Sequence, residues 1–167
     1  MKTIRVGDTV PDFFLRDLDG NIYQIAEFLG KKQLVLIFYP HDGSNGCTNS
    51  VCMFHDISDY FDKDTFEIFG ICGLPAEKIR DSSIIRELNF PIVSDHDNSI
   101  RKSFGLHPLI MGKYSKLFTL SFGLTTGRLT YVTDLQGKVI YTTDPRDVSK
   151  CQADEALKIS FLLKKAR

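Results

Sequence analysis

Apolar residues along the chain follow two kinds of pattern. Continuous apolar runs occupy residues 34–39 and 66–73, which is typical of strands buried on both faces of a sheet. Between them, apolar residues recur at helical spacing over residues 47–61. This order of strand, helix and strand predicts a β-α-β unit at the centre of the fold.

Shorter patterned segments flank this unit. Residues 107–126 show no clear period, so we expect a long loop or insertion there. The other predicted elements are an N-terminal hairpin within 6–21 that covers one sheet edge, a helix over 75–88, a short strand over 90–93, a short helix over 98–104 closed by Gly105, a hairpin over 128–143 with its turn at 135–137, and a closing helix over 154–165.

Together these elements predict an α/β protein with a thioredoxin-like fold: a central mixed β-sheet flanked by helices, with an N-terminal β-hairpin. The chain has 167 residues, 43% of them hydrophobic, which is enough for one buried core and too few for two ordinary domains. We therefore expect residues 1–167 to form a single domain.

Charge and cysteine content narrow the functional class. The 21 basic and 21 acidic side chains give a formal net charge of zero, which argues against a nucleic-acid binder and favours small or neutral substrates. No apolar run reaches the roughly 18 residues of a membrane helix, and the first 13 residues lack the apolar centre of a signal peptide. The four cysteines are too sparse for a secreted disulfide framework, so we expect a cytoplasmic protein.

Cys47 stands where a buried strand, a Gly-rich turn and a helix N-terminus meet. The positive end of the helix dipole and the unpaired N–H groups of a first turn both favour thiolate over thiol. A second thiol, Cys52, follows five residues later. This arrangement predicts an activated nucleophile with a disulfide partner, and hence redox chemistry.

An intact helix keeps these two thiols apart. Residues 47 and 52 of one helix have Cα atoms roughly 8–9 Å apart, whereas a disulfide tolerates no more than about 7 Å. The first turn or two of the helix must therefore unwind before Cys52 can reach Cys47.

The remaining cysteines have simpler interpretations. Cys72 lies inside an apolar strand and is expected in the core, and Cys151 is either an exposed spectator or an alternative resolving thiol. A zinc site built on Cys47, Cys52 and His55 is disfavoured, because this spacing is unusual and a second ligand pair is missing.

Residues 95–99 imitate the start of a calcium-binding loop. However, Ile100 and Leu106 stand where such a loop requires Gly and Glu, so we interpret the segment as a helix-capping turn. We expect neither a metal nor a cofactor.

Several segments, taken together, resemble the peroxiredoxin (AhpC/TSA) family, and within it the bacterioferritin-comigratory, or Q-type, branch. The resemblance covers nearly the whole chain. It is carried by residues 6–13, 38–48, Cys52, 90–95, 127–134 and 137–139.

The resemblance implies roles for individual residues. The family pattern of a Pro, three residues, a Thr or Ser, two residues and the peroxidatic Cys falls on Pro40, Ser44 and Cys47. The family's site arginine falls on Arg128, and the branch's resolving cysteine falls on Cys52.

Two departures distinguish this chain from the branch. Thr-Pro-Gly-Cys is usual where this chain has Ser-Asn-Gly-Cys at 44–47, and the insertion before Arg128 is longer than usual. Ser44 keeps the hydroxyl, whereas Asn45 lacks the fixed φ of proline, so we expect a more mobile loop than in the relatives.

The implied function is a thiol-dependent peroxidase. It would reduce hydrogen peroxide and organic hydroperoxides through a sulfenic acid on Cys47, which Cys52 resolves as an intramolecular disulfide. Thioredoxin or a similar dithiol would recycle the enzyme, as a monomer or a homodimer. The alternatives are a thioredoxin-like protein disulfide oxidoreductase and a redox-sensing or binding module without peroxidase turnover.

Overall fold

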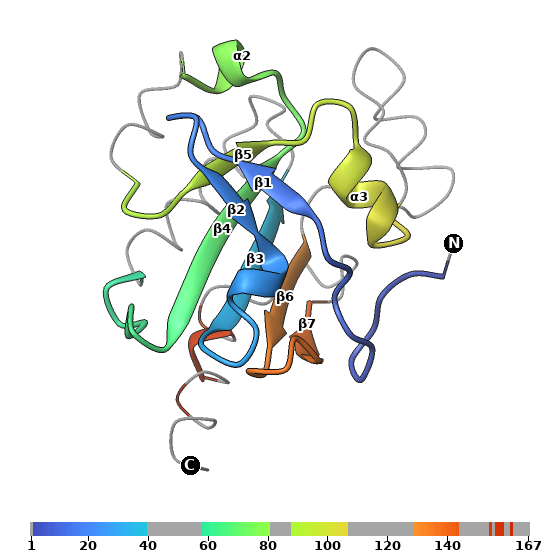
Figure 1. Ribbon diagram of the computed structural model, residues 1–167, viewed down its shortest axis with the longest axis vertical. Coiled ribbons are helices and arrows are strands. Elements are labelled where there is room, and N and C mark those ends of the chain that lie inside the picture. Colours follow the sequence, from blue (N-terminus) through green and yellow to red (C-terminus); the bar gives the residue numbers. More distant parts are fainter. Residues whose placement is uncertain are drawn as a thin grey trace.

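A five-stranded mixed sheet forms the centre of the computed structural model (Figure 1). Its strands are β3 (Gln33–Tyr39), β4 (Phe66–Cys72), β5 (Ile92–Ser94), β6 (Leu129–Thr133) and β7 (Val139–Thr142). Their order in the sheet is β5-β4-β3-β6-β7. β3, β4 and β5 are parallel, whereas β6 pairs antiparallel with β3 and β7 antiparallel with β6. The structure describes residues 2–39, 58–80, 88–106, 129–143, 154, 156–158 and 161.

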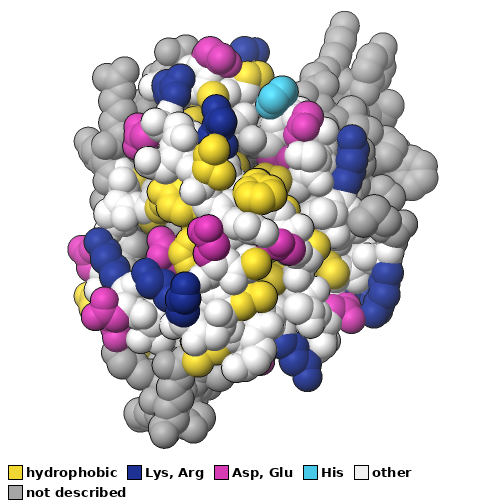
Figure 2. Space-filling model, in the orientation of Figure 1, with side chains coloured by type: hydrophobic (Ala, Val, Ile, Leu, Met, Phe, Trp, Pro, Cys, Tyr) yellow, Lys and Arg dark blue, Asp and Glu magenta, His cyan; other side chains and the backbone are white. Residues whose placement is uncertain are grey.

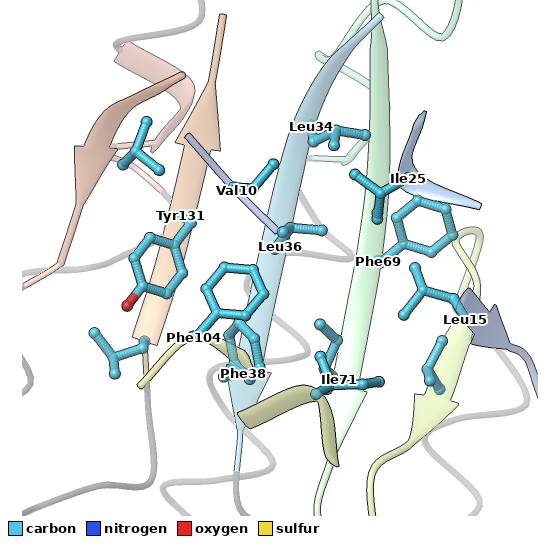
Figure 3. Close-up of a cluster of buried hydrophobic side chains, with 14 residues drawn as sticks. Val10, Leu15, Ile25, Leu34, Leu36, Phe38, Phe69, Ile71, Phe104 and Tyr131 are labelled. Atoms are coloured by element: carbon cyan, nitrogen blue, oxygen red, sulfur yellow. The ribbon is translucent and has the colours of Figure 1, made fainter. Parts of the chain in front are cut away.

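The two predicted central strands occupy the middle of this sheet. Every residue of β3 is buried, as are all residues of β4 except Glu67. Their side chains alternate between two hydrophobic clusters, one on each face. Leu34, Leu36 and Phe38 contribute to the cluster in Figure 3, and the intervening β3 residues contribute to the other. A strand packed on both faces requires a continuous apolar run, which is the pattern that predicted it.

The N-terminal hairpin consists of β1 (Phe14–Arg16) and β2 (Ile22–Gln24), paired antiparallel. Asp17 organises the turn by accepting hydrogen bonds from the backbone N–H groups of Asp19 and Asn21. The hairpin joins the β5 edge of the central sheet, where Asp17 bridges to Val93 and the Leu18 N–H donates to the Ile92 carbonyl. A hairpin therefore joins one sheet edge as predicted, although its second strand lies just beyond the predicted range of 6–21.

Helices are short in the described part of the chain. They are the 3₁₀ turn η1 (Ile25–Glu27), α2 (Ala76–Arg80) and α3 (Ser99–Ser103). The described residues between 154 and 161 are helical, as the closing-helix prediction requires. The helix predicted over 75–88 is confirmed through Arg80, whereas most of the helix predicted over 47–61 and the insertion at 107–126 lie outside the described residues. No helix within the described ranges has the length and apolar character needed to cross a membrane.

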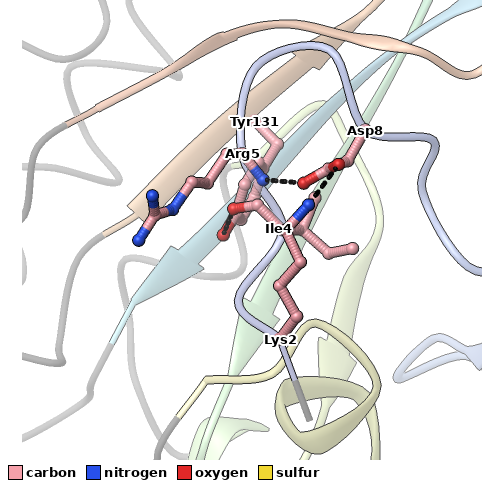
Figure 4. Close-up of polar contacts among 5 residues, drawn as sticks. All are labelled: Lys2, Ile4, Arg5, Asp8 and Tyr131. Atoms are coloured by element: carbon pink, nitrogen blue, oxygen red, sulfur yellow. Dashed lines mark hydrogen bonds and ion pairs between the residues drawn. The ribbon is translucent and has the colours of Figure 1, made fainter.

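The segment before β1 runs along β7, where Gly7 and Asp8 hydrogen-bond to the backbone of Val139, and contacts β6 and the end of α3. The Ile4 N–H donates to the Phe104 carbonyl over 3.0 Å, and the Tyr131 hydroxyl donates to the Ile4 carbonyl over 3.4 Å. The Asp8 carboxylate closes the first turn, because it pairs with Lys2 Nζ and accepts from the Arg5 N–H, both over 2.9 Å (Figure 4). These contacts tie the N-terminus to the layer that covers one sheet face.

The surface in Figure 2 carries basic and acidic side chains interspersed over one face, in keeping with the formal net charge of zero. Phe14 and Ile22 are exposed on the hairpin, which leaves two large apolar side chains in contact with solvent.

Gly105 offers a test of the packing between the N-terminus and α3. Its φ is +64°, and a Cβ atom there would collide with the backbone of Lys2 and Thr3. We expect Gly105→Ala to lower the free energy of unfolding by about 2–4 kcal/mol, from backbone strain and overpacking together. Urea unfolding followed by circular dichroism measures this value.

Gly20→Ala is the matched control. Gly20 also has a positive φ, +92°, but a Cβ there would meet no atom within 4 Å. It should lower the free energy of unfolding by only about 1 kcal/mol, from backbone strain alone. Equal losses in both variants would show that the N-terminal segment does not pack on Gly105.

Candidate active site

The residues predicted to carry the chemistry lie outside the described part of the chain. They are Pro40, Ser44, Cys47, Cys52 and Arg128, together with the alternative thiol Cys151. Their roles therefore remain predictions. What the structure does describe is the frame to which the segments holding them are attached.

That frame is the pairing of β3 with β6. Tyr39 is the last residue of β3 and directly precedes Pro40, whereas Leu129 is the first residue of β6 and directly follows Arg128. Phe38 and Leu129 are register partners. The chain therefore leaves β3 toward the predicted thiol, and enters β6 from the predicted arginine, at neighbouring positions on one edge of the sheet.

The carboxyl ends of the parallel strands meet at the same edge. Tyr39 pairs with Cys72 in β4, and Cys72 pairs with Ser94 in β5. Ligand and catalytic sites of open α/β sheets lie outside the carboxyl ends of the parallel strands. The edge formed by Tyr39, Cys72, Ser94 and Leu129 is thus the candidate site region, which we call the carboxyl edge.

Cys72 is fully buried in β4, so the prediction that it belongs to the core is confirmed. It belongs to the hydrophobic cluster that also contains Ile37 and Tyr39. Its place in the register, opposite Tyr39, puts this thiol at the carboxyl edge without exposing it to solvent.

Asp95 connects the carboxyl edge to α3. Its backbone N–H donates to the Cys72 carbonyl over 2.7 Å, and its carboxylate accepts from the N–H groups of Ile100 and Arg101 over 2.9 and 3.0 Å. Burial raises the pKa of Asp95, and the two N–H donors and the positive charge of Arg101 oppose that rise. The predicted helix-capping turn is therefore confirmed.

Among the described residues, no group of three or more His, Cys, Asp or Glu side chains could hold a metal ion.

Arg101 is a residue of this region that the sequence analysis missed. Its side chain in α3 is fully buried, and its guanidinium carbon lies 5.4 Å from the centroid of the Phe38 ring. Burial lowers the pKa of Arg101 to about 10, against the opposing effects of Asp95, Cys72 and Tyr131. The group is still a cation at neutral pH. The one feature of the sequence that could have indicated this burial is the position of Arg101 between two apolar residues, Ile100 and Phe104.

Tyr131 completes the described surroundings of Phe38. The two rings lie 5.9 Å apart, and both pack against Phe104, at 5.1 Å from Tyr131 and 5.0 Å from Phe38 (Figure 3). Burial raises the pKa of Tyr131 to about 12, so this phenol is neutral at physiological pH. Phe38 is thus held by Phe104 at the end of α3, by Tyr131 in β6 and by the guanidinium of Arg101.

This arrangement, a mixed sheet with a site region at the carboxyl ends of its parallel strands, defines a protein of the thioredoxin-like class. The family model described as AhpC/TSA matches residues 6–142. The chain belongs to the AhpC/TSA family of peroxiredoxins, and its similarities place it in the Q-type branch.

Two plant relatives illustrate the match. The chain is 33% identical to chloroplastic peroxiredoxin Q of Oryza sativa subsp. japonica over 153 residues, which are 92% of this chain and 65% of the rice protein. It is also 33% identical to chloroplastic peroxiredoxin Q of Sedum lineare over 158 residues, 95% of this chain and 78% of that protein. The chain therefore spans slightly less than two thirds of the rice relative.

Solved structures agree on the fold. Peroxidoxin BcpB from Mycobacterium tuberculosis has a TM-score of 0.76 and 27% identity, with 96% of this chain and 98% of that chain covered. A C47S mutant of PrxQ from Xylella fastidiosa has a TM-score of 0.73 and 21% identity over the full length of both chains, which is a likeness of fold. The predicted thioredoxin-like fold and peroxiredoxin resemblance are thus confirmed.

Asp95 offers a test of how firmly the carboxyl edge is held. Asp95→Ala leaves the buried N–H groups of Ile100 and Arg101 without their acceptors, so we expect a loss of about 2–4 kcal/mol in the free energy of unfolding. Urea titration followed by circular dichroism measures it.

Asp97→Ala is the control, because Asp97 is exposed and its carboxylate accepts from the Ser99 N–H over 3.1 Å. Its loss should stay near 0.5–1 kcal/mol, as for an exposed cap. If Asp95→Ala were no more destabilising than this control, Asp95 would not anchor α3 to the sheet.

Proposed function

We propose that this protein is a thiol-dependent peroxidase that reduces hydrogen peroxide and organic hydroperoxides. The observation that carries the proposal is the match of residues 6–142 to the AhpC/TSA family. Within that family we assign the peroxidatic role to Cys47, on the motif that Pro40 and Ser44 share with it. The register of Phe38 with Leu129 supports it, because it brings the attachment points of the Cys47 segment and of Arg128 together.

The first step is attack of the Cys47 thiolate on one oxygen of the peroxide bond. A sulfur–oxygen bond forms, the O–O bond breaks, and the departing oxygen leaves as an alcohol or water after taking up a proton. The sulfur loses two electrons and becomes a sulfenic acid, and the peroxide gains these two electrons.

Thiolate formation alone does not explain a fast reaction. Lowering a thiol pKa from about 8.5 to about 6 raises the thiolate fraction at pH 7 about 30-fold. A lower pKa also makes the thiolate a weaker nucleophile. With a Brønsted slope of about 0.4–0.5 this loss is roughly tenfold, which leaves a net gain of only a few-fold. Most of the rate must therefore come from groups that stabilise charge on the departing oxygen.

We assign that stabilisation to Arg128, the Ser44 hydroxyl and backbone N–H groups near Cys47. Preorganised donors aimed at developing charge are usually the largest contribution in such sites. Pro40 would exclude water from the thiol, which strengthens each of these interactions.

In the second step, the Cys52 sulfur attacks the sulfenic sulfur, and water leaves as the disulfide forms. The separation expected for two thiols five residues apart on one helix would require local unwinding first. An external dithiol, such as thioredoxin, then reduces the disulfide by exchange. The residues that we propose for both steps belong to one chain, so we propose a monomer that works in a reducing compartment such as the cytoplasm.

Variants of the two cysteines test the proposal in a coupled assay of peroxide consumption with thioredoxin, thioredoxin reductase and NADPH. Cys47→Ser should reduce turnover to background, because the nucleophile is gone. Cys52→Ser should consume about one equivalent of peroxide and stop as a sulfenic acid, which dimedone labels.

Cys151→Ser is the control and should keep the turnover of the unchanged protein. Sustained turnover by Cys47→Ser would contradict the proposal. Reduction of insulin disulfides without any peroxide consumption would favour a protein disulfide oxidoreductase instead.

A further inference from the structure

We propose that Arg101 is a positioning residue for the peroxidase reaction: through Phe38 it fixes the end of β3 and supplies a buried positive charge at the carboxyl edge. The inference rests on the proposed function. It concerns a residue of α3 that lies far in the sequence from the predicted catalytic residues.

The first support is the burial of a long cationic side chain that is normally exposed. Arg101 has no solvent exposure, whereas Lys102, the next residue of α3, is exposed. Removing a guanidinium from water is unfavourable unless the surroundings compensate. At this position the surroundings include the face of the Phe38 ring, 5.4 Å from the guanidinium carbon, within the range of a cation–π contact.

The second support is what Phe38 does in the sheet. Its ring is enclosed by Phe104 just after α3, by Tyr131 in β6 and by the guanidinium of Arg101 in α3, and these three contacts fix its orientation. Phe38 is the next-to-last residue of β3 and the register partner of Leu129. A displacement of Phe38 would move both attachment points of the predicted site.

The third support is the charge around Arg101. Among the described residues, the ionisable groups that act on Arg101 are Asp95 before α3, Cys72 in β4 and Tyr131 in β6. The reaction proposed above needs two anions near this edge, the Cys47 thiolate and the departing oxygen, and a buried cation favours both.

Arg101→Met tests the charge, because it removes the cation and keeps a long apolar side chain. The measurement is the rate at which iodoacetamide alkylates Cys47 in the reduced protein between pH 5 and 9, read by peptide mass spectrometry. A nearby buried cation favours the thiolate, so its removal should raise the midpoint by roughly half a unit or more. The kcat/KM for hydrogen peroxide should fall about tenfold.

Arg101→Lys separates charge from stacking, because lysine keeps the cation but lacks the flat guanidinium. Its alkylation midpoint should match that of the unchanged protein, while its kcat/KM falls severalfold. Lys102→Met, on the same helix, is the matched control and should change neither quantity.

Three results would overturn the inference: an unchanged midpoint in folded Arg101→Met, an unchanged kcat/KM in Arg101→Lys, or an equal midpoint shift in Lys102→Met. If Arg101→Met does not fold, Arg101→Gln replaces it with the same expected shift. Alkylation does not require turnover. Absence of peroxide consumption by the unchanged protein would therefore contradict the proposed function, and the alkylation midpoints would still test the effect of Arg101 on Cys47.

Discussion

The antiparallel pairing of β6 with the buried strand β3 is the constraint on which the rest of the structure depends. Phe38 and Leu129 are partners in this pairing, although they lie far apart in the sequence. Because β3 is packed on both faces, a slip of one residue would turn every apolar side chain of β6 to the wrong face. The two hydrophobic clusters therefore fix the register, and the register fixes where the predicted site segments begin.

Electrostatics at the carboxyl edge depend on the same pairing. Phe38 presents its ring to Arg101 because the alternation of β3 directs this side chain to the face covered by α3. Asp95 holds α3 to the end of β4 through the Cys72 carbonyl. The pairing thus keeps a buried cation next to the end of β3, at the carboxyl edge.

Much of this fold could be predicted from the sequence. Both central strands were predicted to within one residue at each end, because burial on two faces leaves an uninterrupted apolar run. β5 was predicted over 90–93 but pairs over Ile92–Ser94. The reason is that Phe90 packs against the core without pairing, so the apolar signal begins before the ladder.

The site was predictable only in part. Cys47 and Cys52 were predicted from local signals, a strand end, a Gly-rich turn and an expected helix start, and both lie outside the described residues. Arg101 was missed because a charged residue in a helix is normally solvated, and its burial depends on Phe38 and Asp95, which no local pattern connects to it. Local sequence patterns do not predict contacts between segments that are distant in the sequence.

The central claim is that Cys47 and Cys52 form one redox cycle. The most direct test is intact-mass analysis of the unchanged, reduced protein after one equivalent of hydrogen peroxide, followed by peptide mapping. The account predicts loss of two hydrogens and a disulfide that joins residues 47 and 52. A stable sulfenic acid on Cys47, or a disulfide to Cys151 in place of Cys52, would contradict it.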